Sequence, residues 1–182
     1  MIPRCLLMLA AFGLPLLCQD GEPPKLPFFD WKACPFEGCR YGGWTAIKPI
    51  AVYDKWEEAR RPITRLAKDE KVLAVKGVVI TFKPGIIRMD RDVPEQGLKR
   101  GETILTYAYR GEGFSAVWVH GKYRGDFDIS FTKWPNGMGC GGDHCAATYV
   151  DLGRKVWWVQ VKLASGRMGW LNTEGADFDC ER

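Results

Sequence analysis

Residues 156–171 read VWWVQVKLASGRMGWL, and this stretch decides the fold class. Valine and tryptophan fill its beginning, a glycine-containing turn follows at 164–167, and a second apolar run ends at Trp170 and Leu171. β-branched and aromatic residues on both sides of a glycine turn are typical of an antiparallel hairpin. The stretch therefore predicts two neighbouring strands close to the C-terminus.

Alternation along the first of these strands assigns its two faces. Side chains at 157, 159 and 161 point one way, and those at 158, 160 and 162 point the other way. The second set contains Gln160 and Lys162, so its face reads as polar. We expect Trp157 in the core and Trp158 exposed on the opposite face.

The rest of the chain shows the same kind of short β-type runs between glycine or proline turns. DFDISFT at 126–132 and FSAVWVHGK at 114–122 alternate with period two, and VLAVKGVVITF at 72–82 is interrupted by Gly77, which indicates a bulge or bend. One weak helical candidate, 55–61, ends at Pro62. These patterns predict a mainly β protein, a barrel or a sandwich with little helix.

Composition places the chain among globular proteins. Of its 182 residues, 46% are hydrophobic and 26% charged, and 8 Trp, 6 Tyr and 9 Phe exceed what a disordered chain would carry. The length suits one domain. Acidic and basic residues alternate, as in KDEK at 68–71 and RMDRD at 88–92, whereas a phosphate-binding face needs an unbalanced basic patch. We therefore predict no nucleic-acid partner.

The N-terminus has the anatomy of an export signal. Arg4 precedes the uncharged stretch CLLMLAAFGLPLLC at 5–18, which is too short for a good membrane span of about 20 residues. We assign 1–18 to a signal peptide, 19–33 to a proline-rich tether and 34–182 to the folded domain. The protein is expected to be secreted or periplasmic. Cys18 stands where a bacterial lipoprotein keeps its acylated cysteine, although no small residue precedes it; membrane attachment is expected only if Cys18 is lipidated.

Five cysteines remain after removal of the signal, in the pattern CPFEGC, CGGDHC and a C-terminal singleton. In an exported protein they predict disulfides. We favour a Cys140–Cys145 bond, because Gly141 and Gly142 permit a tight loop, and a second bond from one of Cys34 or Cys39 to Cys180. Zinc binding by the two C-x4-C pairs with His144 is the alternative, but structural zinc sites more often use shorter spacers, and no metal is predicted.

Two stretches together resemble the bacterial SH3-like (SH3b) domain family. The first, AVYDKWEEARRPITRLAKDEKVLAV at 51–75, is similar to the opening of such a domain, and 156–171 is similar to its closing hairpin, which ends in Gly169–Trp170. The resemblance implies a single SH3-like antiparallel barrel in which 77–155 is a β-rich insertion. It also implies binding to cell-wall peptide or glycan, or to a protein partner in the envelope. A shared fold alone does not decide function.

No catalytic constellation stands out in the sequence. His120 and His144 are the only histidines, and no Ser or Cys lies in a nucleophile-elbow context. GMGCGG at 137–142 spells G-x-G-x-x-G, but it lies in a cysteine-flanked loop and reads as a turn, so no cofactor is predicted. A carboxylate pair, Asp126 and Asp128, shares one strand face and with His120 supports an alternative hypothesis, an envelope hydrolase.

Exposed aromatic residues are the stronger functional indication. A cleft formed by Trp118, Trp134, Tyr149 and Trp158 is suited to stacking sugars or gripping an extended peptide. The sequence thus predicts an exported, non-catalytic SH3-like binding module of the bacterial envelope. A structural or inhibitor protein that presents the loop 134–144 is a third possibility.

Overall fold

The structure, a computed structural model, describes residues 21–34, 40–135, 139–174 and 178–180. These residues form β strands for the most part, with two single-turn 3-10 helices, η1 (Pro94–Gln96) and η2 (Gly142–His144). The mainly β class with little helix is confirmed. Among the described residues no helix is long and apolar enough to cross a membrane.

The first sheet, sheet A, is built from the two ends of the chain. Its strands follow the order β14-β2-β5-β12-β13-β3-β4, and β1 pairs with the far half of β5. The strands are β1 (Phe28–Trp31), β2 (Gly42–Ala46), β3 (Ile50–Tyr53), β4 (Pro62–Leu66), β5 (Lys71–Lys83), β12 (Arg154–Lys162), β13 (Met168–Asn172) and β14 (Phe178–Cys180).

The second sheet, sheet B, comes from the middle of the chain and has the order β10-β11-β6-β7-β8-β9. All its pairs are antiparallel except β10 with β11. Its strands are β6 (Gly85–Met89), β7 (Thr103–Gly111), β8 (Phe114–Val119), β9 (Lys122–Asp128), β10 (Thr132–Lys133) and β11 (Ala147–Asp151).

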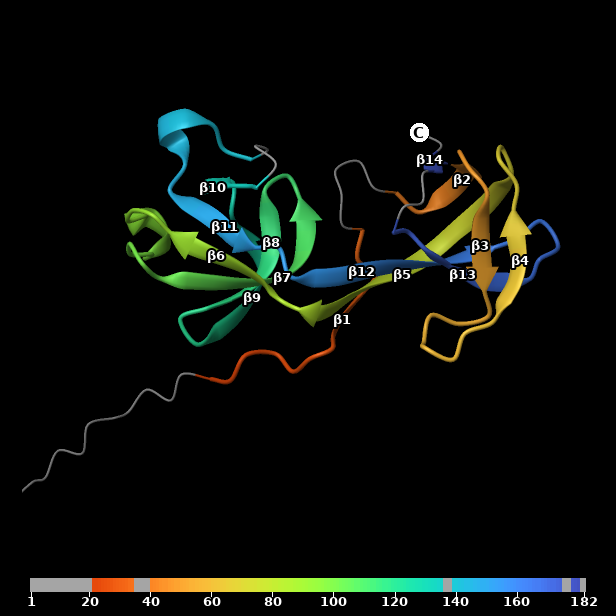
Figure 1. The fold of residues 1–182 in the computed structure, drawn as a ribbon, viewed down its shortest axis with the longest axis horizontal. Helices are drawn as coiled ribbons and strands as arrows, with labels where there is room; N and C mark the ends of the chain where they lie inside the picture. The colour runs from red at the N-terminus through yellow and green to blue at the C-terminus, as the bar shows by residue number, and fades with distance from the viewer. Residues whose placement is uncertain (1–20, 35–39, 136–138, 175–177, 181–182) are drawn as a thin grey trace, which may run out of the picture.

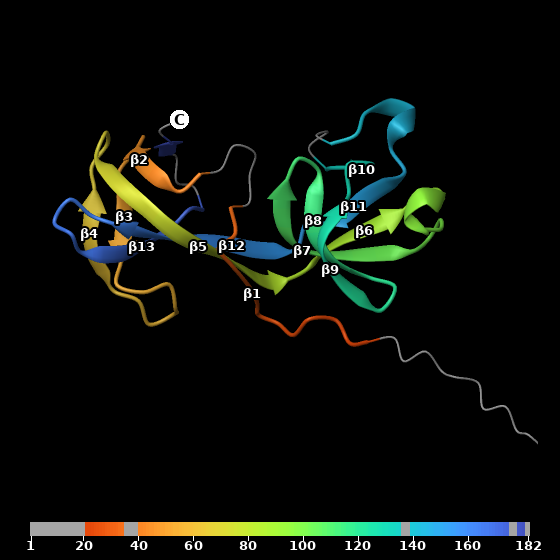
Figure 2. The same ribbon diagram turned by 180° about the vertical axis from the view of Figure 1, so that it is seen from behind.

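A long two-stranded ribbon joins the two sheets. β5 and β12 pair from Leu73 with Lys162 at one end to Lys83 with Arg154 at the other. Figure 1 shows this ribbon running lengthwise through the molecule, with the curled sheets A and B at its two ends, and Figure 2 shows the same arrangement from behind. The chain thus leaves sheet A through β5, forms sheet B, and returns through β12.

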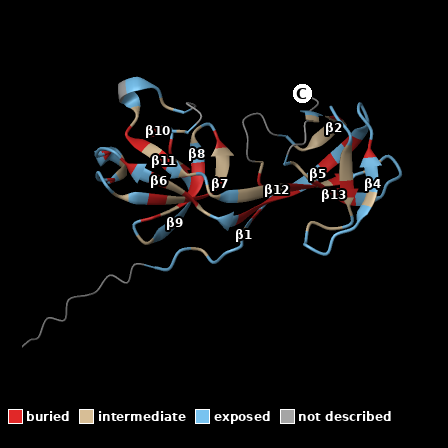
Figure 3. Ribbon diagram, viewed as in Figure 1, coloured by how far each residue is buried: buried red, intermediate tan, exposed pale blue. Residues whose placement is uncertain are grey.

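Each sheet encloses its own apolar cluster, and a third cluster lies between them. Sheet B buries residues such as Ile87, Ile104 and Val117, while sheet A buries Val52, Leu66, Val159, Val161 and Leu171. The middle cluster joins Ala33 and Val79 to Tyr107, Ala108 and Ala116. Figure 3 shows buried residues along the shared ribbon as well as within both sheets. Val79 and Tyr107 are almost wholly buried in the middle cluster, so burial of their apolar surface stabilises the junction between the sheets.

The predicted C-terminal hairpin is confirmed, since β12 and β13 pair from Trp158 with Asn172 to Lys162 with Met168. The two stretches that carry the SH3-like resemblance also meet in sheet A, where Trp170 pairs with Tyr53. A single SH3-like barrel is not confirmed. The stretch 77–155 includes all of sheet B, because its alternating strands carry enough apolar side chains to fill a core of their own.

Two local predictions meet different outcomes. The interruption at Gly77 is confirmed: the register between β5 and β12 shifts next to it, and a Cβ at Gly77 would lie 2.4 Å from Trp157 Nε1. The helical candidate 55–61 is wrong, because this segment is a turn-rich loop. Asp54 Oδ1 accepts a 2.8 Å hydrogen bond from the Arg61 backbone N–H, which closes the loop. Trp56 packs, partly buried, against neighbouring aromatic side chains, and this contact holds the segment in its loop conformation.

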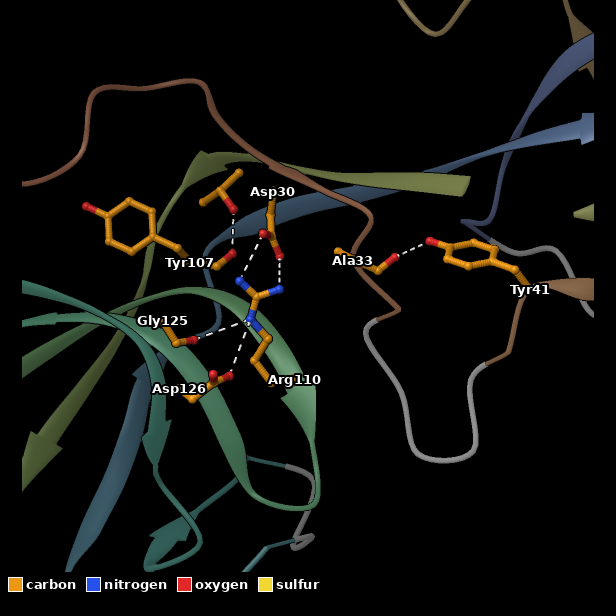
Figure 4. Close-up of polar contacts among 8 residues, drawn as sticks. Asp30, Ala33, Tyr41, Tyr107, Arg110, Gly125 and Asp126 are labelled. Atoms are coloured by element: carbon orange, nitrogen blue, oxygen red, sulfur yellow. Dashed lines mark hydrogen bonds and ion pairs between the residues drawn. The ribbon is translucent and has the colours of Figure 1, made fainter. Parts of the chain in front are cut away.

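The folded part begins earlier than residue 34, because β1 lies within the stretch assigned to the tether. Asp30 of β1 accepts two hydrogen bonds from the Arg110 guanidinium of β7, at 2.5 and 2.9 Å, although the two residues are 80 positions apart. Figure 4 shows Arg110 between Asp30 on one side and Gly125 and Asp126 on the other. Beside this pair, Thr81 donates a 2.5 Å hydrogen bond to the Tyr107 carbonyl. β1 is therefore attached to both sheets.

Candidate functional site: an aromatic cavity in sheet B

A cavity of about 800 Å³ opens between sheet B and the ribbon. Cavities of roughly 300–1,000 Å³ hold small ligands in proteins. Its lining combines aromatic rings, small residues, hydroxyls and one lysine: Thr106, Ala108, Tyr109, Glu112, Gly113, Ser115, Ile129, Ser130, Trp134, Gly139, Cys140, Tyr149, Leu152 and Lys155.

Three aromatic side chains from different elements make one wall. The ring centroids of Trp134, just after β10, and Tyr149 of β11 are 4.8 Å apart at an interplanar angle of 54°. Tyr109 of β7 also contacts Trp134 edge-on, with ring centroids 6.1 Å apart. Tyr149 is buried, whereas Trp134 is only half-buried and retains surface that a ligand can contact. Aromatic pairs of this geometry add about 0.5–1.5 kcal/mol beyond the area they bury.

The loop after β10 holds Trp134 in place. Cys140 and Cys145 form the predicted disulfide, with Cα atoms 5.3 Å apart, which is confirmed. Gly139 lies directly against the indole, since a Cβ there would be 2.5 Å from Trp134 Cδ1. The Cys140 N–H also donates to the Thr132 carbonyl at 3.3 Å. The disulfide thus anchors the loop beside the cavity wall.

Hydroxyl groups line the buried end of the cavity. The Tyr149 hydroxyl donates to Thr106 Oγ1 at 3.2 Å, and the buried Ser115 also lines this part of the cavity. Burial raises the pKa of Tyr149, so the phenol stays neutral and available as a hydrogen-bonding group. The hydroxyls at this end of the cavity offer neutral hydrogen-bond donors and acceptors.

Lys155 is the only cation among the described residues that line the cavity, and its side chain is half-buried. Its Nζ donates a 2.8 Å hydrogen bond to the Leu152 carbonyl and lies 3.5 Å from Thr106 Oγ1. Burial lowers the pKa of Lys155 to about 8, and the nearby Asp151 acts in the opposite direction. Asp151 itself pairs with Lys83. Within the described part of the chain, no carboxylate forms an ion pair with Lys155.

The absence of a side chain at Gly85 makes room for this lysine. A Cβ at Gly85 would lie 2.5 Å from Thr106 Oγ1 and 3.1 Å from Lys155 Nζ. Gly85 is the first residue of β6, and Lys155 lies near the start of β12, so the lysine sits where the ribbon joins sheet B. Sequence reasoning missed Lys155, because no local pattern marks a lysine whose neighbours Gly85 and Thr106 come from two distant segments.

The structure brings together two of the four aromatic residues predicted to bind a ligand. Trp134 and Tyr149 share the cavity wall, while Trp118 packs half-buried against the middle cluster and does not line the cavity.

The prediction that Trp158 is exposed is wrong, since only 4% of it is accessible. The alternation itself holds, because Trp158 does face away from Val159. The face opposite Val159 is covered: Val78, Ile80 and Trp170 surround the indole, and Arg60 from the loop before β4 lies 4.9 Å above its ring.

The three residues of the hydrolase hypothesis have separate partners. His120 Nε2 lies 3.0 Å from Glu102 Oε2, Asp126 lies 3.9 Å from Arg110 Nε, and Asp128 accepts a 2.8 Å bond from the Ser130 N–H. None of the three lines the cavity.

The predicted second disulfide and the zinc alternative involve residues near both ends of the domain. Cys34 is disulfide-bonded, but Cys39 and the side chain of Cys180, on which the predicted second bond depends, lie outside the described residues. The described residues contain no cluster of three or more metal-ligating side chains. Comparisons with family models, with curated proteins and with solved structures find no match for this chain.

Proposed function

We propose that the chain is an exported, non-catalytic binding protein of the bacterial envelope that holds a soluble fragment of the cell wall in the cavity of sheet B. The observation that carries this proposal is the contact between Trp134 and Tyr149, which forms an aromatic wall in a cavity of ligand size. The sequence resemblance to SH3-like modules supports the same class of ligand.

The chemistry of the lining suits a sugar or a short peptide. Trp134 and Tyr109 offer aromatic surface to the apolar face of a sugar ring or to a side chain, while Thr106 and Ser115 provide hydroxyls at the buried end. The polar groups at that end are hydroxyls and one amine, and they can orient a ligand through hydrogen bonds. A concave cavity fits such a fragment better than it fits the flat surface of a protein partner.

Two further features support export. The N-terminal stretch has signal-peptide anatomy, and a disulfide between Cys140 and Cys145 is the kind of bond that persists in oxidising compartments. Both features agree with a ligand located in the envelope.

The proposal is tested with soluble muropeptides released enzymatically from purified cell wall. We expect the protein to bind them, and Trp134→Ala to weaken binding tenfold or more, whereas Trp118→Ala, which removes a half-buried tryptophan outside the cavity, leaves affinity within about twofold. No binding of muropeptides and no retention on insoluble wall at any salt concentration would remove the wall ligand and favour an envelope protein as partner.

A further inference from the structure

We infer that the ligand of this cavity carries one singly charged anionic group, and that the Lys155 ammonium receives it while the Trp134–Tyr149 wall holds the apolar part. This inference rests on the proposed role of the cavity as a binding site and adds the chemical class of the ligand.

Lys155 is a partly buried cation with no carboxylate at ion-pair distance among the described residues, and Asp151, the acidic group that acts on it, already pairs with Lys83. Lysines are seldom buried without a compensating charge, because removing an ammonium from water is costly. The neighbouring Lys83 shows the usual solution, since it pairs with Asp151 on the outer side of the same junction. Lys155 instead contacts two neutral oxygens and lines the cavity. An anionic ligand in the cavity would therefore compensate its charge.

The hydrogen bonds of the amine leave room for a ligand. An ammonium has three donors, and the Leu152 carbonyl and Thr106 Oγ1 accept two of them. One donor remains for a ligand at the cavity side. Gly85 makes this position possible, because a side chain there would collide with the hydroxyl that helps orient the amine.

The charges of the lining limit the charge of the ligand. Lys155 is the only cation among the described lining residues, and the exposed Glu112 adds a negative charge. The charged group that acts on the amine is Asp151, which pairs with Lys83, and the Tyr149 hydroxyl shares Thr106 Oγ1 with the amine. A phosphate dianion is usually bound by several donors or by arginine, whereas one amine suits a monoanion.

The inference is tested with two fluorescent probes that differ by one group. 8-Anilinonaphthalene-1-sulfonate carries a monoanionic sulfonate, and N-phenyl-1-naphthylamine is the same aromatic framework without it. We expect Lys155→Met to weaken binding of the sulfonate probe about 10- to 100-fold and to leave the neutral probe within about twofold. Lys162→Met, an exposed lysine on the same strand outside the cavity, should change neither affinity.

The outcomes separate the inference from the proposed function. Equal affinity of the folded wild-type protein for the two probes, or an equal change in both on Lys155→Met, would overturn the inference of an anionic ligand and leave the cavity as a binding site. Failure of both probes to bind would count against the cavity itself. Lys155→Gln provides a second variant, and thermal melting of each preparation verifies that the fold is intact.

Discussion

Asp30 and Arg110 form a bidentate ion pair, at 2.5 and 2.9 Å, between the first strand of sheet A and the second strand along the chain in sheet B. Asp30 is 8% exposed, and burial raises its pKa while Arg110 opposes that shift. The pair lies beside the Thr81–Tyr107 hydrogen bond and the middle apolar cluster. Together these contacts join the two sheets. They lie next to Ala108 and Tyr109, which line the cavity, and therefore hold that part of the cavity wall in position.

Removing the carboxylate of Asp30 should therefore destabilise the protein. Asp30→Ala leaves the Arg110 guanidinium without its main partner, and we expect the free energy of unfolding to fall by about 3 kcal/mol, as for other broken buried pairs. Asp126→Ala is the matched control, because Asp126 is 78% exposed and lies 3.9 Å from the same guanidinium. The control should cost less than about 0.5 kcal/mol. Equal losses in urea denaturation of the two variants would contradict this role for Asp30.

Replacing Lys155 should stabilise the protein while it weakens anion binding. Lys155→Met keeps the length of the side chain and removes a partly buried charge, so we expect a gain of about 1 kcal/mol below pH 8, a figure reduced because the side chain is only half-buried. The sign follows from linkage: between the folded pKa of about 8 and the unfolded value of 10.5, the unfolded state binds more protons.

The pH dependence provides the check on Lys155. Wild-type stability should rise relative to Lys155→Met as the pH increases from 8 to 10.5, so that the difference in melting temperature between the two proteins shrinks. Over the same range, affinity of the wild-type protein for 8-anilinonaphthalene-1-sulfonate should fall as the amine loses its proton. A difference in melting temperature that stays constant with pH would show that the Lys155 pKa is not depressed.

Trp158 should behave as a core residue. Because 4% of it is exposed, Trp158→Ala is expected to cost about 3–5 kcal/mol of unfolding free energy. Trp31→Ala serves as control, since Trp31 is 49% exposed and its loss should cost less than about 1 kcal/mol. Guanidinium denaturation of both variants makes the comparison, and a small loss for Trp158→Ala would restore its assignment to an exposed face.

Opening the Cys140–Cys145 bond should affect the cavity before it affects the whole fold. A disulfide that closes so short a loop contributes about 2 kcal/mol in the chain-entropy account. We expect Cys140→Ser/Cys145→Ser to melt at a lower temperature and to bind N-phenyl-1-naphthylamine several-fold more weakly, because the loop that positions Trp134 loses its anchor. Unchanged probe affinity in the folded double variant would show that the loop keeps its shape without the bond.

Local patterns in the sequence predicted much of the fold. The hairpin 156–171 was readable because its strands and turn are adjacent in the chain, and the faces of Phe127 and Ile129 followed from alternation. The Cys140–Cys145 bond was readable for the same reason. Each of these features depends on residues a few positions apart.

The features that sequence reasoning missed depend on distant segments. Alternation placed Trp158 opposite Val159, but it carries no information on what covers that face, and residues from β3, β13 and the loop before β4 do so. Lys155 acquires its surroundings from Gly85 and Thr106, which are brought close only by the crossing of the chain between the sheets. The alternating pattern in 77–155 indicated β strands. It did not indicate that these strands would form a separate sheet around a core of their own.

A displacement titration tests most directly whether wall fragments occupy the cavity of sheet B. In this titration, soluble muropeptides are added to the folded protein with N-phenyl-1-naphthylamine bound. The account predicts that probe fluorescence falls to its free value as muropeptides are added, and that Trp134→Ala binds neither the probe nor the muropeptides with wild-type affinity. Muropeptides that bind while probe fluorescence stays constant would place the ligand elsewhere on the molecule and contradict the account.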